Sequence, residues 1–157
     1  MIPSDIYRIE KTRLAVALRL RGGNVINGVV FAQAAGQNGG PEEVADVLND
    51  ADPFFPLLTR GGQTLLVAKE HVLEAMPNDG SQLDEERHAT AVAAEVELTL
   101  EDGTQRLGSV LIEMPHERPR VLDFLNFGTD RFVSLHGGDT TTLINRQAIA
   151  CVRPLDQ

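Results

Sequence analysis

Side chains that could carry catalysis or bind a metal are few in this sequence and lie far apart. There are four histidines, His71, His88, His116 and His136. None has a second histidine or a cysteine at the spacing that metal sites use. Ser109 and Ser134 lie in strand-like patterns without the base and orienting acid that nucleophilic catalysis requires. We therefore predict a protein that is not an enzyme, with no catalytic residue, no metal site and no cofactor.

Two other features that resemble functional motifs have simpler structural explanations. The run LHGGDTT at 135–141 looks like a phosphate-binding loop, but it lacks the lysine that neutralises phosphate, and no helix pattern follows it. We expect a turn between strands there. The single cysteine, Cys151, lies in the apolar run AIACVRPL and cannot form a disulfide within the chain. We expect it to be a small, buried hydrophobic residue.

The composition opposes general binding to nucleic acid. The 157 residues carry a formal net charge of −9, and binding to phosphate backbones needs lysine and arginine to displace counterions. Only the beginning of the chain is locally basic, with Arg8, Lys11, Arg13, Arg19 and Arg21. Neither a secretory signal nor an apolar stretch approaching about twenty residues is present, so we expect a cytoplasmic protein with no membrane partner.

The sequence patterns of the strands and helices that must position any site occur twice along the chain. The stretch AVALRLRGGNVINGVVF at 15–31 aligns with EVELTLEDGTQRLGSVL at 95–111, and Val16 and Gly28 recur as Val96 and Gly108, 80 residues later. The spacing is 77 at Val44/Val121, Asp46/Asp123, Leu48/Leu125 and Asn49/Asn126, and it is 78 at Phe54/Phe132, Leu57/Leu135 and Leu65/Leu143. Matches at a nearly constant spacing along the whole unit indicate a tandem repeat.

Each copy predicts the same series of elements. Alternating apolar residues predict a first strand with one buried face, and a glycine-containing turn leads to a second strand. Gly28 or Gly108 inside that strand indicates a barrel bend or a close backbone approach. The phrases PEEVADVLN and PRVLDFLN then predict a helix of one or two turns, which Asn49 or Asn126 ends in a left-handed conformation. Three more short strands follow, which gives five antiparallel strands per copy.

These features resemble the Sm-like family, the RNA-associated small barrels that form rings. The glycine of the second strand, the phrase from Asp123 to Asn126 and the final run LINRQAIACV occur in the family's order, and the first copy repeats them. More closely, the chain resembles two fused bacterial Sm-like domains, in which a helical insert bearing "LN" is typical. The resemblance implies a mostly β fold of two tandem five-stranded, SH3-like small barrels, each with a short helix inserted between strands two and three.

The repeat also predicts the domain boundaries. The first Sm-like repeat spans 1–77 and the second spans 91–157. Residues 78–90, NDGSQLDEERHAT, are polar and rich in turn-forming residues, so we interpret them as a linker.

The resemblance implies a small set of candidate ligand-binding residues, Asn49, Asn126, Asn145 and Arg146. RNA-binding members of the family use the corresponding Asn and an Arg to hold a nucleotide, but they have Arg-Gly where this chain has Asn145-Arg146. A structural interpretation competes with each candidate. Asn49 and Asn126 are also suited to ending a helix, and Arg146 is suited to a solvent-facing turn or an interface ion pair.

The leading functional hypothesis is a non-enzymatic structural or interaction module. Sm-like folds satisfy the unpaired backbone groups of an open edge by adding a neighbour's strand, so we expect a homo-oligomer. Three chains would form a pseudo-hexameric ring, whereas a self-contained pair of copies would remain a monomer or dimer. A protein partner is an alternative occupant of the edge. The alternative function is RNA binding through Asn145, Arg146 and the basic N-terminal strand, which the net charge disfavours. An enzyme or small-ligand receptor is the third hypothesis.

Overall fold

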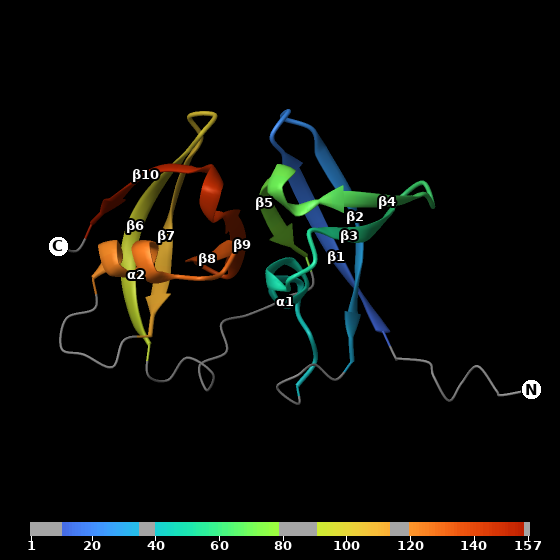
Figure 1. The fold of residues 1–157 in the computed structure, drawn as a ribbon, viewed down its shortest axis with the longest axis horizontal. Coiled ribbons are helices and arrows are strands. Elements are labelled where there is room, and N and C mark those ends of the chain that lie inside the picture. The colour runs from blue at the N-terminus through green and yellow to red at the C-terminus, as the bar shows by residue number, and fades with distance from the viewer. Residues whose placement is uncertain (1–10, 35–39, 79–90, 114–119, 156–157) are drawn as a thin grey trace, which may run out of the picture.

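The computed structural model describes residues 11–34, 40–78, 91–113 and 120–155, and it is mostly β. Ten antiparallel strands form one sheet, and two α-helices accompany it (Figure 1). The prediction of a mostly β fold is confirmed. Neither α-helix is long and apolar enough to span a membrane within the described part of the chain. The linker expected over 78–90 lies outside the described residues except for Asn78.

We call residues 11–78 the first half and residues 91–155 the second half. The elements of the first half are β1 (Lys11–Leu20), β2 (Val25–Gln33), α1 (Val44–Asn49), β3 (Phe54–Thr59), β4 (Thr64–Ala68), the 3-10 helix η2 (Lys69–His71) and β5 (Val72–Pro77). The elements of the second half are β6 (Val92–Leu100), β7 (Gln105–Ile112), α2 (Val121–Phe127), β8 (Phe132–Gly137), β9 (Thr140–Asn145), the 3-10 helix η3 (Arg146–Ala148) and β10 (Ile149–Pro154).

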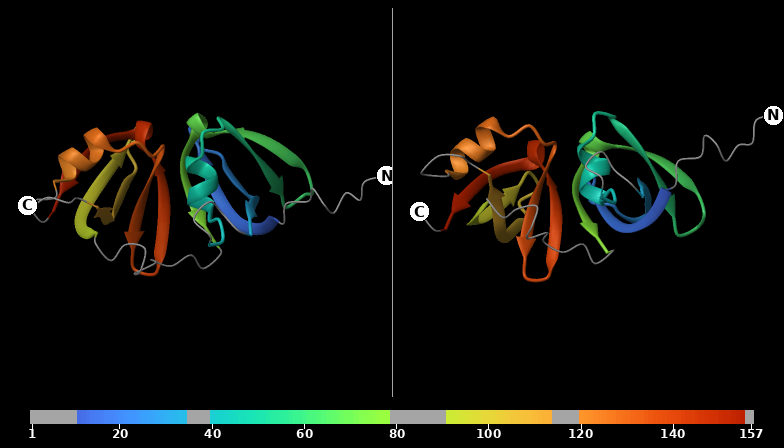
Figure 2. Two further views of the ribbon diagram at one scale, coloured as in Figure 1. Left: turned by 60° about the horizontal axis from the view of Figure 1, so that its bottom comes forward. Right: turned by 90° about the horizontal axis from the view of Figure 1, so that it is seen from below.

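The strands lie in the order β10-β6-β7-β8-β9-β5-β1-β2-β3-β4. Each half therefore contributes five neighbouring strands, and β9 and β5 join the halves at the centre. The sheet curls within each half but stays open, and β10 and β4 are its two ends (Figure 2). The division into two small barrels consequently stays a prediction.

The two halves use the same strand register. Val16 lies opposite Gly28 in the first half, and Val96 lies opposite Gly108 in the second. The pairing of β1 with β5 shifts by one residue after Arg19, and the pairing of β6 with β10 shifts at the corresponding point. Equivalent positions of the halves can therefore be assigned from the hydrogen-bond ladders as well as from the letters.

The ladders correct one position of the sequence alignment. Leu57 lies opposite Leu65, whereas Leu135 lies opposite Thr142. The counterpart of Leu143 is therefore Leu66 and not Leu65, because the turn before β9 is one residue shorter than the turn before β4.

Gly28 and Gly108 mark a close backbone approach, one of the two explanations that the sequence left open. A Cβ atom on Gly28 would lie 2.5 Å from the carbonyl oxygen of Leu58, and one on Gly108 would lie 2.7 Å from that of His136. Real Cβ atoms essentially never come so close. Glycine is thus required because the backbones of β3 and β8 lie very close to the second strand of their half at this point.

The predicted left-handed helix ends are wrong. Helix α1 ends at Asn49 and is followed by Asp50 at φ −68°, and α2 continues to Phe127 before Gly128 at φ −66°. No described residue other than glycine has a positive φ. The two asparagines are not bent into a cap, so their side chains are available for other contacts.

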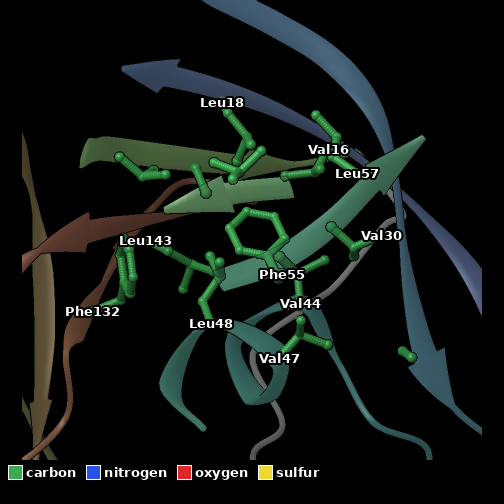
Figure 3. Close-up of a cluster of buried hydrophobic side chains, with 14 residues drawn as sticks. Val16, Leu18, Val30, Val44, Val47, Leu48, Phe55, Leu57, Phe132 and Leu143 are labelled. Carbon is green, nitrogen blue, oxygen red and sulfur yellow. The ribbon is translucent and has the colours of Figure 1, made fainter. Parts of the chain in front are cut away.

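The aliphatic core forms two clusters. The first surrounds side chains such as Leu18, Leu48 and Leu57, and the second surrounds Leu98, Val110 and Leu135. The second cluster is built from the second half alone, but the first also contains Phe132 and Leu143 (Figure 3). The second half therefore completes the core of the first, and nothing among the described residues does the same for the second.

Candidate interaction edges of the sheet

The junction between the halves shows how an edge of this sheet is covered. Strands β5 and β9 pair antiparallel, with Glu74 opposite Ile144 and Ala75 opposite Leu143. Side chains alternate across a strand, so the two pairs face opposite sides of the ladder. Leu143 packs into the core of the first half, and Ile144 packs into the core of the second. This short ladder is the only strand pairing between the halves in the described residues.

Two asparagines hold the junction by side-chain hydrogen bonds to backbone groups. Asn49, at the end of α1, accepts a bond from the backbone N–H of Phe132 at 2.8 Å. The amide nitrogen of Asn145 donates to the carbonyl oxygen of Val72 at 2.9 Å, and its side-chain oxygen accepts from the N–H of Gln147 at 3.0 Å. Asn145 is buried. Both candidates thus have a structural partner, and each bond links one half to the other or shapes the turn beside the junction.

A charged cluster crosses the same junction. The carboxylate of Glu74 is fully buried, and it accepts hydrogen bonds from Nε of Arg19 at 2.9 Å and from Nη2 of Arg106 at 2.7 Å. Arg19 also forms an ion pair with Asp102 in the turn between β6 and β7. Next to it, Nη1 of Arg21 lies 2.6 Å from Oε2 of Glu101. Two arginines and one glutamate of the first half are therefore matched by one arginine and two carboxylates of the second.

The pKa of Glu74 reflects this matching. Burial acts to raise the pKa, but the hydrogen bonds and positive charges of Arg106 and Arg19 together outweigh it. The pKa of Glu74 consequently lies below its ordinary value, and the side chain is ionised at neutral pH. A buried ion pair is stable only when its charged groups are also hydrogen-bonded, and the carboxylate of Glu74 accepts such bonds from both arginines.

The apolar contacts of the junction come mainly from Phe132 and Leu143. Each is 1% exposed, and Figure 3 shows both beside the cluster that contains Leu48 and Phe55. Around them Leu48, Val72 and Ala75 are fully buried. The first half is sealed at this point by the second.

The equivalent surface of the first half, on β3 and β4, is uncovered. Phe54 corresponds to Phe132 and is 57% exposed, and Leu66 corresponds to Leu143 and is 73% exposed. β4 is an end strand of the sheet, so one row of its backbone groups has no strand beside it. Large apolar side chains beside an open strand edge are typical of an interaction site.

The second half is correspondingly open on β10 and α2, which we treat together as its unsealed side. Leu125, Ile149 and Val152 are only partly buried, although their counterparts Leu48, Val72 and Ala75 are fully buried. β10 is the other end strand of the sheet. In Figure 1 β10 and β4 lie at opposite ends of the molecule. The chain thus carries a projecting surface at one end and a receiving surface at the other.

Cys151 is exposed, so the expectation of a buried cysteine is wrong. It lies on β10, opposite Thr99 of β6. Apolar flanking residues predict burial only when a second strand covers the far side, and β10 has none. Cys151 occupies the position that corresponds to Glu74 on β5.

Arg146 supports the end of helix α2. Its Nη1 donates to the carbonyl oxygen of Leu125 at 3.0 Å and its Nε to that of Asp130 at 2.8 Å, while the guanidinium lies 5.7 Å from the ring centre of Phe124. Partial burial lowers the pKa of Arg146. The corresponding residue, Lys69, is fully buried and donates to Asp50 beside α1 at 2.6 Å. Among the four candidates only Asn126 is exposed.

A cavity of about 590 Å³ opens between α1 and the second half. Acidic side chains among its lining residues are Glu43, Asp46, Glu113 and Asp130, and the basic ones are Arg146 and His136. The excess of carboxylates makes the cavity unsuited to a phosphate group. The described residues contain no group of three or more His, Cys, Asp or Glu side chains that could hold a metal ion.

Sequence reasoning missed Glu74 and Arg106, and it named Arg19 only as part of the basic N-terminal strand, although these three residues form the charged cluster of the junction. A signal for them exists only where the copies differ, because their counterparts are Cys151, Thr99 and Ile26. Comparisons of the chain with protein-family models, with curated proteins and with solved structures find no match. The two ends of the sheet are therefore the candidate functional surfaces of this chain.

Proposed function

We propose that this protein is a non-enzymatic interaction module that assembles with copies of itself through the free edges of its sheet. Each chain would consist of two tandem Sm-like small barrels, 1–77 and 91–157, each with a short helix between its second and third strands. The cytoplasmic location expected from the sequence belongs to this proposal.

One observation carries the proposal: the two open surfaces are equivalent to the two sides of a junction that the chain already makes. Phe132 and Leu143 are buried against the first half, whereas their counterparts Phe54 and Leu66 are exposed. The residues of the second half that would receive such side chains are only partly buried. Strand β10 of one chain can therefore pair with β4 of the next, as β5 pairs with β9.

The energetics of such a contact are reasonable. Fully burying a leucine or phenylalanine side chain contributes about 1.5–3 kcal/mol. Phe54 and Leu66 would each contribute on one side, and the partly buried residues around Ile149 would contribute on the other. Association itself costs about 4–15 kcal/mol, so the new backbone ladder and the flanking polar contacts are needed as well.

The contact is head-to-tail, because it joins different surfaces of the two chains. Repetition of a head-to-tail contact closes into a ring or continues as a filament, depending on the rotation at each step. Three chains would make the pseudo-hexameric ring that the resemblance implies, and two would make a closed dimer.

Light scattering coupled to size-exclusion chromatography tests the proposal. We expect the wild-type protein to form a discrete oligomer that dissociates on dilution. Leu66→Asp places a charge in the proposed contact and should give monomers. Leu107→Asp is the matched control, because Leu107 is an exposed leucine on β7, away from both sheet ends. A wild-type protein that stays monomeric up to its highest soluble concentration contradicts the proposal.

RNA binding is the alternative, and the described residues favour it less. The side chains of Asn145 and Arg146 are hydrogen-bonded to backbone groups within the chain. Arg19 and Arg21 of the basic strand form ion pairs at the junction. Filter binding to U-rich and A-rich oligonucleotides at low and physiological salt tests this function. Salt-sensitive binding that is lost in Asn126→Ala would favour it.

A further inference from the structure

We infer that the contact between chains is chemically distinct from the junction within the chain, and that Cys151 and Ile26 meet where Glu74 and Arg106 meet inside it. This inference rests on the proposed assembly and names its partner, a second copy of this chain, and the residues that select it. Each residue of the internal junction has a counterpart at one of the two sheet ends, and these counterparts would meet in the contact between chains.

Some contacts are retained in this transfer. Asn49 accepts from the N–H of Phe132, and the equivalent pair is Asn126 with the N–H of Phe54. Asn126 is exposed, and Phe54 begins β3 next to the open edge. In the proposed contact, the side chain of Asn126 would therefore accept a hydrogen bond from the backbone N–H of Phe54 of the next chain, as Asn49 accepts one from Phe132.

A second contact is retained with its charges reversed. Inside the chain Arg21 of the first half pairs with Glu101 of the second. The two residues are also each other's counterparts in the repeat, at the turns 21–24 and 101–104. Glu101 of one chain would therefore meet Arg21 of the next. The turns 21–24, with Arg21, and 101–104, with Glu101, would then alternate around the assembly. Each arginine would have a glutamate on either side, and each glutamate an arginine.

The buried cluster, in contrast, is replaced by neutral residues. Glu74 corresponds to Cys151 and Arg106 corresponds to Ile26, as the shared register of the two halves shows. Arg19 and Asp102 correspond to Thr99 and Gly22. Cys151 is exposed, and Ile26 is partly buried against the first core. The chain-to-chain contact would thus bury a thiol and an aliphatic side chain where the internal junction buries an ion pair.

This difference keeps the two kinds of junction apart. If β5 of one chain docked on β4 of another, Glu74 would lose Arg106 and Arg19 would lose Asp102, because Ile26 and Gly22 stand at those positions. If β10 docked on β9, Arg106 would lose its carboxylate. Burying one member of a charge pair alone weakens a contact strongly, by about 100-fold or more. The pairing of β5 with β9 and of β10 with β4 avoids both losses.

The test transplants the charged pair to the chain-to-chain contact. Cys151→Glu should weaken assembly by about 100-fold or more, and adding Ile26→Arg should restore it. Cys151→Ser, which adds no charge, is the matched control and should assemble like the wild type. The inference is overturned if Cys151→Glu assembles as well as wild type, or if a folded double variant assembles no better than Cys151→Glu.

A cross-linking measurement decides the matter if the double variant does not fold. Glu74 lies opposite Ile144, so Cys151 should lie opposite Val67 of the next chain. Val67→Cys should then form a disulfide with the native Cys151 between chains under mild oxidation, seen as higher bands on a non-reducing gel. Leu107→Cys is the control. Equal cross-linking in both variants overturns the inference, whereas a monomeric wild-type protein overturns the proposed function instead.

Discussion

Asn49 accepts a hydrogen bond from the backbone N–H of Phe132 at 2.8 Å, although the two residues are separated by 83 positions in the chain. The bond joins the end of helix α1 to the beginning of β8. The side chain of the same residue, Phe132, packs into the core of the first half. This polar contact thus lies beside the apolar contact by which the second half seals the first core.

Removing this contact should destabilise the chain itself. Asn49→Ala leaves the N–H of Phe132 without its acceptor in a part-buried site, which costs about 1–3 kcal/mol of unfolding free energy. Asn126→Ala is the control, since its side chain is exposed, and it should change this free energy by less than about 0.5 kcal/mol. Urea unfolding in a Leu66→Asp background, where assembly is blocked, measures both. Equal effects of the two variants would contradict the assignment.

The interior glycines of the second strands should not tolerate a side chain. Gly28→Ala and Gly108→Ala force a Cβ against the carbonyl oxygens of Leu58 and His136, which should cost about 1–3 kcal/mol or more. Gly61→Ala is the control, because a Cβ there would meet only Thr59 at 3.9 Å. Thermal unfolding followed by circular dichroism compares the three. If Gly28→Ala unfolds at the same temperature as Gly61→Ala, the close approach is not real.

How far the sequence predicts this fold is clear from the glycines and the strands. Alternating valines and leucines and the recurring Gly28 and Gly108 are sufficient to predict the strands and their succession along the chain, because these features depend on each copy alone. The positions of Asn49 and Cys151 could not be predicted in the same way. Asn49 depends on a partner 83 residues away, and the exposure of Cys151 depends on which strand stands at the end of the sheet.

The charged cluster should make stability depend on pH. The pKa of Glu74 lies below its ordinary value of 4.5 in the folded protein, so its ionised form stabilises the fold. That contribution is complete above pH 4.5 and is lost as the pH falls through the lower folded pKa. Glu74→Gln should therefore lower stability at neutral pH, and the difference from wild type should shrink as the pH falls below 4.5.

Urea midpoints measured across this pH range provide the test for Glu74. Glu70→Gln is the matched control, since Glu70 lies close by in sequence but its side chain is exposed. The control should match the wild type at every pH, because exposed ion pairs contribute little. A constant difference between Glu74→Gln and wild type from neutral to acid pH would show that folding does not lower the pKa of Glu74.

Arg146 should act through helix α2 and not through a ligand. Arg146→Ala removes two charge-assisted hydrogen bonds, to Leu125 and Asp130, and should destabilise the chain by about 1.5–3 kcal/mol. Arg146→Lys keeps the charge but cannot reach both carbonyl oxygens as a fork does, so it should recover only part of the loss. Arg153→Ala, on an exposed arginine of β10, is the control, and all variants are compared in the Leu66→Asp background, where assembly is blocked. Wild-type stability of Arg146→Ala would contradict the structural role.

The candidate site illustrates why repeats mislead as well as inform. Asn145 and Arg146 were singled out by their place in a family motif, but each is held by its own neighbours in this chain. Glu74 and Arg106, which no motif marks, carry the junction. Residues that differ between two copies of a repeat show how the interfaces of the copies differ. An alignment that looks for identical residues does not reveal them.

The two ends of the open sheet differ, because β4 lies beside the exposed Phe54 and β10 belongs to the unsealed side of the second half. This polarity limits the assemblies that the proposed contact could form. In the proposed assembly whole chains are the only units that can be added, so every closed circle would contain an even number of halves. A chain blocked at β4 still offers β10, and it should act as a terminator that stops growth at one side only. Mixing in a small amount of Leu66→Asp would then shorten or break wild-type assemblies without entering their interior.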